Sequence, residues 1–177
     1  MRFFFSEYSP VNQEEIMSKL TDFLLHEGKT DSGLHFSDVI YMKKDELETT
    51  HDYIQWIFPL PEPSRFVPGS PVLTQEEYDA LHKGLYHLDR LVMAKGRFLT
   101  FLDEYDGWMV DIDHNHARIS RVLKCLSLFR GLEYSTKFWD QVFYLLARAN
   151  KDVSQQTKNF WQEAIHYREN QRTIRWK

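Results

Sequence analysis

Residues 51 to 58, HDYIQWIF, place three polar side chains at helical spacing among bulky apolar ones. His51 and Gln55 are four residues apart and Asp52 lies three residues before Gln55, so on a helix the three share one narrow stripe. An imidazole, a carboxylate and an amide in this arrangement can exchange protons or hydrogen-bond a ligand. The stripe is therefore a candidate recognition site.

The same stripe has a structural interpretation. Apolar residues cover almost every other side of the segment, which indicates that it is buried. A buried polar group without a partner costs about 1–3 kcal/mol, so each of the three needs a hydrogen bond. An internal polar network that fixes the following proline-rich segment onto the protein is the favoured interpretation, because the flanking aromatic residues require burial.

A second set of polar residues is basic. Arg118, Arg121 and Lys124 form a short stripe on one face of a predicted helix, where phosphate or an acidic partner can bind. A solvated face paired with acids such as Asp111 or Glu133 is the favoured interpretation.

Other reactive residues lack the spacing that their chemistry needs. His114 and His116 are two residues apart, so a helix points them in different directions, and no local pattern of metal ligands occurs. The stretch HEGKT, residues 26 to 30, lacks the first glycine and the preceding strand of a phosphate-binding loop. Cys125 has no neighbouring base to activate it. We therefore expect no metal, no cofactor and no catalytic thiol.

Composition limits the class of protein. The chain has 177 residues, 42% hydrophobic and 15% aromatic, which predicts one domain, residues 1–177, with a large aromatic core. The net charge is −4, so nucleic-acid binding is not expected. No apolar run approaches the roughly 20 residues of a membrane helix or the core of a signal peptide. A single cysteine fits a reducing compartment, and we expect a cytoplasmic protein.

Apolar residues recur at helical intervals along most of the chain. The first stretch carries Glu14, Glu15, Ile16, Leu20, Phe23 and Leu24 and ends at Gly28. The others cover residues 36–48 with Ser37 as a cap, 51–58 behind Thr49 or Thr50, 74–104, 113–131, 135–150 and 154–170.

The two longest stretches have clear ends. Thr74 and Glu77 form a capping box that opens one helix as far as Glu104. Asp113 caps the next helix and Gly131 ends it. The residues expected to face inward are Tyr78, Leu81, Leu85, Leu88, Val92, Leu99 and Leu102 in the first, and Ile119, Val122, Leu123, Leu126 and Phe129 in the second.

Five of the six prolines fall between Pro59 and Pro71. Proline removes a backbone donor and keeps the preceding residue extended, so this segment cannot be a regular helix. Within it, residues 68–71 have the minimal form for display to a proline-reading domain. The predicted fold is all-α, a single-domain bundle of five to seven helices with a proline-rich crossover loop.

The stretch HDYIQWIFPLPEPS, residues 51–64, closely resembles the signature of the opioid growth factor receptor conserved-region family, with Ile57 at a position where leucine is common. A second stretch, HNHARISRVLKCL, residues 114–126, is similar to another segment of that family. There Ser120 stands at a threonine position and Val122 at an isoleucine position. The resemblance runs from about residue 35 to 165.

The resemblance implies recognition of a peptide, since the family is named for a receptor of an enkephalin growth-regulating peptide. We expect a non-enzymatic helical module that binds a peptide or protein segment beside residues 51–58 and the proline-rich loop. The candidate ligand-binding residues are His51, Asp52, Gln55, Trp56, His114, Asn115, Arg118 and Arg121.

Two alternatives remain at this stage. One is an enzyme or small-ligand binder whose pocket is formed by distant polar residues such as His51, Asp52 and His114. The other is binding of an enkephalin-like peptide. The oligomeric state is left open.

Overall fold

A computed structural model describes residues 18–83, 85–170 and 176, without the side chains of 85–88. The expected positions of Glu14, Glu15, Ile16, Leu85 and Leu88 lie outside this description.

The described residues form helices and no β-strand, so the all-α prediction is confirmed. Five helices have nine or more residues and the rest have four to seven, in keeping with the expected bundle. The helices are α1 (Lys19–Leu25), α2 (Phe36–Tyr41), α3 (Lys44–Thr49), α4 (Tyr53–Ile57), α5 (Gln75–Lys83), α6 (Leu85–Glu104), the 3-10 turn η1 (Asp106–Trp108), α7 (His114–Arg130), α8 (Leu132–Ala149), α9 (Gln155–Ile165) and α10 (Tyr167–Asn170).

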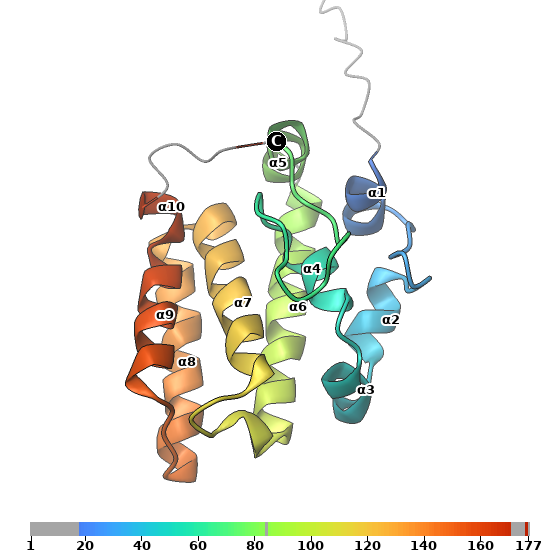
Figure 1. Ribbon diagram of the computed structural model, residues 1–177. Coiled ribbons are helices and arrows are strands. Elements are labelled where there is room, and N and C mark those ends of the chain that lie inside the picture. Colours follow the sequence, from blue (N-terminus) through green and yellow to red (C-terminus); the bar gives the residue numbers. More distant parts are fainter. Residues whose placement is uncertain (1–17, 84, 171–175, 177) are drawn as a thin grey trace, which may run out of the picture.

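The long helices α6 to α9 lie side by side, and α1 to α4 cover the opposite side of α6 (Figure 1). Helix α7 packs against both α8 and α9 and is buried on almost every side. The residues of α7 that were expected to face inward are all buried, as predicted. Asp113 caps the start of the helix, where its carboxylate accepts a hydrogen bond from the Asn115 backbone (2.7 Å), and Gly131 follows its last residue, both as predicted.

The predicted helix over residues 36–48 is two helices, α2 and α3. Met42 separates them with an extended backbone (φ −54°, ψ 139°). The guanidinium of Arg97 on α6 donates to the Met42 carbonyl from Nε (3.2 Å) and Nη2 (2.6 Å), which satisfies the carbonyl that the break leaves free. Ser37 lies inside α2, and His35 is the cap residue, so the expected cap was wrong.

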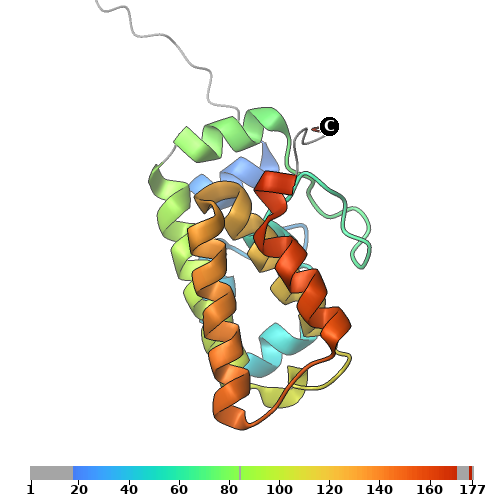
Figure 2. The ribbon, with the colours of Figure 1, turned by 90° about the vertical axis from the view of Figure 1, so that its left-hand side faces the viewer.

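The predicted helix over residues 74–104 is also two helices. The capping box at Thr74 and Glu77 is present, with hydrogen bonds of 2.8 and 3.2 Å. Helix α5 then lies across the end of the bundle while α6 runs along it (Figure 2). Val92 is exposed, and the buried residues among positions 89–104 of α6 are Leu91, Ala94, Phe98, Phe101 and Leu102. The prediction continued one apolar face along the whole of residues 74–104. Because α5 and α6 run in different directions, the buried face of α6 does not continue that of α5.

Candidate functional site

Arg118, in the second signature stretch, binds the backbone just before the first stretch. This α7 side chain is only 5% exposed. Its Nη1 donates to the Leu47 carbonyl (2.9 Å), and its Nη2 donates to the carbonyls of Glu48 (3.2 Å) and Thr50 (2.9 Å). These carbonyls belong to the C-terminal end of α3, where a helix leaves acceptors unpaired and favours a positive charge. Arg118 therefore closes α3 from a distant part of the chain.

Glu48 and Asn115 complete the polar contacts around this guanidinium. Asn115 is fully buried, accepts from Arg118 Nη1 (3.0 Å) and donates to the Glu48 carboxylate (3.0 Å). The carboxylate also lies 3.3 Å from His114 Nε2. The rings of His114 and His51 lie 5.6 Å apart, centroid to centroid. The structure thus brings together His51, His114, Asn115 and Arg118 from the candidate residues.

Gln55 is buried and joins α4 to the proline-rich loop. In the orientation that satisfies its amide, Nε2 donates to the carbonyls of His51 (3.1 Å) and Asp52 (2.9 Å), and the amide oxygen accepts from the Ser64 hydroxyl (3.2 Å). The Ser64 oxygen in turn accepts from the backbone N–H groups of Phe66 (3.3 Å) and Val67 (3.1 Å). Gln55 has the partners expected of an internal support.

The other members of the stripe differ from Gln55. The His51 side chain is exposed, and its Nδ1 donates to the Thr49 carbonyl (2.8 Å). Asp52 is half-buried at the start of α4 and makes no side-chain capping bond. Trp56 is 2% exposed, and its ring packs edge-on against Phe23 with centroids 5.5 Å apart.

Arg121 and Lys124 continue the contacts of α7, with Phe58 just before the proline-rich loop and with Glu62 inside it. Arg121 Nε donates to the Phe58 carbonyl (2.8 Å). Burial lowers the pKa of Arg121 to about 10, and the group remains protonated at neutral pH. Lys124 Nζ donates to Glu62 (2.7 Å) and lies over the ring of Tyr167.

The expectation that this basic stripe is a solvated face was wrong. Arg118, Arg121 and Lys124 each bind residues 47–62 instead of Asp111 or Glu133. The sequence contained a signal that this stripe lies beside the core. Arg118 and Arg121 directly precede the inward-facing residues Ile119 and Val122. What the candidate residues bind outside this chain stays a prediction.

The proline-rich loop does not display residues 68–71 as a polyproline helix. Gly69 has a φ of +83°, and the Ser70 backbone donates to the Val67 carbonyl (3.3 Å). This is a turn, whereas proline-reading domains bind an extended left-handed helix with φ near −75°. Display to such a domain in this conformation is therefore excluded.

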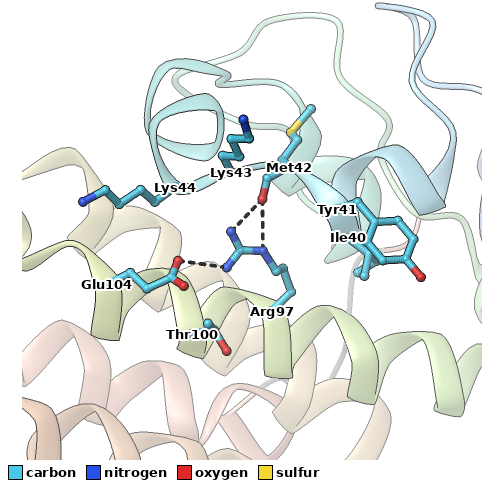
Figure 3. Close-up of a pocket in the computed structure, with 8 residues that line it drawn as sticks. All are labelled: Ile40, Tyr41, Met42, Lys43, Lys44, Arg97, Thr100 and Glu104. Atoms are coloured by element: carbon cyan, nitrogen blue, oxygen red, sulfur yellow. Dashed lines mark hydrogen bonds and ion pairs between the residues drawn. The ribbon is translucent and has the colours of Figure 1, made fainter.

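An open hollow of about 660 Å³ lies between the C-terminal half of α6 and the α2–α3 junction (Figure 3). At its floor, Arg97 holds the Met42 carbonyl and lies 3.6 Å from the Glu104 carboxylate. The lining residues are Ile40, Tyr41, Met42, Lys43, Lys44, Arg97, Thr100 and Glu104.

A second hollow of about 370 Å³ adjoins the first and shares Ile40 and Tyr41 with it. We call the two together the α2–α6 groove. The residues that line the second hollow are His26, Glu27, Phe36, Ser37, Ile40, Tyr41, Asp89, Arg90 and Met93. Neither hollow is lined by residues 51–71, beside which a groove was expected.

Sequence reasoning missed the α2–α6 groove. Tyr41 is 84% exposed and Met93 is 52% exposed. Each is a bulky apolar residue two positions after a buried residue of its helix, Val39 for Tyr41 and Leu91 for Met93. Apolar residues outside the buried face of a helix were the signal that the sequence offered for this groove. They indicate a groove only once the fold places the two helices side by side.

Reactive groups are sparse. Burial raises the pKa of the Cys125 thiol far above its ordinary value, so the thiolate needed for nucleophilic attack is not formed at neutral pH. Across residues 18–83, 89–170 and 176, no three His, Cys, Asp or Glu side chains are grouped so that they could hold a metal ion. Among the described helices, none is long and apolar enough to cross a membrane.

Comparison with known proteins gives one family. The family described as the opioid growth factor receptor (OGFr) conserved region matches residues 13–104, just over half of the chain. The first signature stretch lies inside this range, and the second, residues 114–126, lies beyond it.

The opioid growth factor receptor of Mus musculus is 32% identical over 124 residues, which cover 58% of this chain and 19% of the mouse protein. That of Rattus norvegicus is also 32% identical over 124 residues, which cover 58% of this chain and 21% of the rat protein. The chain therefore spans about a fifth of the length of these relatives. No solved structure matches it. From the family match, this chain belongs to the opioid growth factor receptor conserved-region family.

Proposed function

We propose that this chain is a non-enzymatic interaction module that binds a peptide or protein segment in the α2–α6 groove. The observation that carries the proposal is the pair of adjoining hollows with exposed Tyr41 at their junction and exposed Met93 beside it. Exposed bulky apolar side chains at a concave surface are typical of sites where a partner is bound.

Two further observations support this placement. Every residue that lines the groove lies within residues 13–104, the part of the chain that matches the family. The relatives from mouse and rat are named as receptors, and a receptor must bind a ligand. We place the module in the cytoplasm as one domain with a peptide or protein partner and no nucleic acid.

The polar groups of the larger hollow favour binding over catalysis. Arg97 is engaged by the Met42 carbonyl and Glu104, and the Thr100 hydroxyl donates to the Gly96 carbonyl (3.1 Å). Among the residues that line this hollow there is no histidine to act as a base. A nucleophile needs a base within hydrogen-bonding reach.

Selection of a random dodecapeptide library on the wild-type protein tests the proposal. Enriched peptides are synthesised, and their dissociation constants are measured by fluorescence anisotropy on Tyr41→Ala and Tyr144→Ala. Tyr144 on α8 is 64% exposed and lies outside the groove, so it is a matched control. We expect Tyr41→Ala to raise the dissociation constant about tenfold, as for a residue that contributes strongly to binding. Tyr144→Ala should raise it less than about twofold.

The proposal fails if no peptide is enriched, or if the enriched peptides bind Tyr41→Ala as tightly as wild type. The same titration with an enkephalin peptide tests the possibility that comes from the family resemblance.

A further inference from the structure

The α2–α6 groove has charges of opposite sign at its two ends. Lys43, Lys44 and Arg97 line the larger hollow, where Glu104 is the one acidic lining residue. Figure 3 shows the Lys44 side chain at the same end of the hollow as Glu104, and the Lys43 side chain directed away from Arg97. Within the described part of the chain, no carboxylate forms an ion pair with Lys43 or Lys44. This end therefore has ammonium charge to offer an acidic ligand.

The other end is acidic. Glu27 and Asp89 line the smaller hollow and are both exposed. Arg90, which also lines it, is half-buried, with its Nη1 donating to the Phe23 carbonyl (3.0 Å) and its guanidinium 4.9 Å from the centroid of the Phe36 ring. The two carboxylates outnumber the Arg90 guanidinium, so the net charge of this end is negative.

Apolar surface joins the two ends. Ile40 and Tyr41 line both hollows, and Met93 lies one turn of α6 before Arg97. From Asp89 to Glu104 the helix rises about 22 Å at 1.5 Å per residue. An extended chain advances about 3.3 Å per residue, so roughly seven residues span that distance.

We propose that the groove binds an extended segment of a partner protein, about seven residues long, in a single direction. An acidic residue of the segment lies at the Lys44 end, apolar side chains contact Tyr41 and Met93, and a basic residue lies at the Glu27 and Asp89 end. This inference rests on the proposed function and adds the chemistry and orientation of the ligand. Oppositely charged ends disfavour a nucleic acid, because its phosphates carry one sign along their whole length.

The test uses the peptides enriched on the wild-type protein and the variant Lys44→Glu, with Lys151→Glu as its matched control. Lys151 is an exposed lysine between α8 and α9, so its replacement makes the same change of charge outside the groove. We expect acidic and basic residues at opposite ends of the selected sequences. Lys44→Glu should weaken binding about fivefold to tenfold, more at low salt than at high salt, and Lys151→Glu less than about twofold.

A charge swap then tests the register of the segment. Replacing the acidic residue of the peptide by lysine should weaken binding to the wild type and restore part of the binding to Lys44→Glu, as a double-mutant cycle measures. If peptides bind, and Tyr41→Ala weakens their binding about tenfold while Lys44→Glu does not change it, the charge inference is wrong and the proposed function stands.

Three other results overturn the inference. In the first, no peptide is enriched, and the proposed function is lost with it. In the second, a 20-base oligonucleotide binds and Lys44→Glu abolishes that binding, which makes the groove a phosphate site. In the third, sedimentation velocity shows self-association that Lys44→Glu removes, which makes the occupant a second copy of the chain.

Discussion

Gln55 shows how one buried amide can hold two segments together. It lies in a helix of five residues whose side chains are all buried, and its amide bridges the start of that helix and Ser64 in the loop. Ser64 accepts two backbone hydrogen bonds, so the conformation of the loop at Phe66 and Val67 depends on the same contact. His51, four residues earlier, is exposed and has only a local bond to Thr49.

Replacing these two residues should therefore have different effects. Gln55→Ala removes the acceptor of the Ser64 hydroxyl and the amide donor to the carbonyls of His51 and Asp52, and we expect it to lower the free energy of unfolding by about 1–3 kcal/mol. In thermal unfolding this corresponds to a lower midpoint by roughly 3–8 °C. His51→Ala should change stability by less than about 0.5 kcal/mol. Equal losses in the two variants would contradict this assignment.

At the scale of elements, α7 supports three segments that precede it in the chain. Arg118 closes the C-terminal end of α3, Arg121 holds the Phe58 carbonyl after α4, and Lys124 holds Glu62 in the loop. The three cations occur at intervals of three residues, so one face of one helix fixes the whole path from residue 47 to 62. The second signature stretch thus holds the chain from just before the first stretch, at Leu47, to Glu62 within it.

Arg118→Met should destabilise the protein by about 2–4 kcal/mol, because the carbonyls of Leu47, Glu48 and Thr50 lose a charged donor at a helix end. Arg118→Lys should recover only part of the loss, since an ammonium cannot reproduce the planar guanidinium fork. Arg130→Met, in the last turn of the same helix, removes a half-buried cation that lies over the Tyr134 ring and should cost less than about 1 kcal/mol. Urea unfolding of the three variants measures these differences. Similar losses for Arg118→Met and Arg130→Met would contradict the role of Arg118 in stabilising the C-terminal end of α3.

At the scale of the whole molecule, the core contains ionisable groups in their neutral form. Burial raises the pKa of Tyr53 to about 12, and it also raises the pKa values of Tyr167 and Cys125. The Tyr53 hydroxyl is buried and has no hydrogen-bond partner among the described residues. Each of these groups ionises in the unfolded chain before it ionises in the folded protein.

Stability should therefore fall at alkaline pH. Below about pH 8 all three groups are protonated in both states, and their contribution is fully present. As the pH rises from about 10 towards 12, the unfolded chain loses the Tyr53 proton while the folded protein keeps it, so unfolding becomes easier by up to about 2–3 kcal/mol from this group. The pKa of Arg121 is lowered to about 10, so above pH 10 the folded protein loses this proton before the unfolded chain does. This one group therefore favours folding as the pH rises, whereas the other three favour unfolding.

Urea unfolding at pH 8, 9, 10 and 11 measures this dependence, and a flat profile would contradict it. Tyr53→Phe is the control. It removes the ionising group together with an unpaired hydroxyl, so the variant should lose stability less steeply with pH. At pH 7 it should be at least as stable as the wild type.

The sequence by itself determined most of the helices and several of their ends. Apolar spacing identified the inward face of α7, and Asp113, Gly131 and the Thr74–Glu77 box marked helix ends. It also favoured an internal network, and Gln55 has the partners of one. Apart from the contact of Gln55 with Ser64, which spans nine residues, these features depend on residues within four positions of each other or on apolar periodicity, so they can be read from the chain without knowing its path.

Only the tertiary structure decided the partners of the charged residues and the position of the groove. Arg118 binds Leu47 and Arg97 binds Met42 across long stretches of sequence, and the second of these contacts accompanies the break between α2 and α3. The change of direction between α5 and α6 set which face of α6 is buried and left Met93 beside Tyr41. No local spacing encodes such contacts, because a long charged side chain pairs with whichever carbonyl or carboxylate packing brings within its reach.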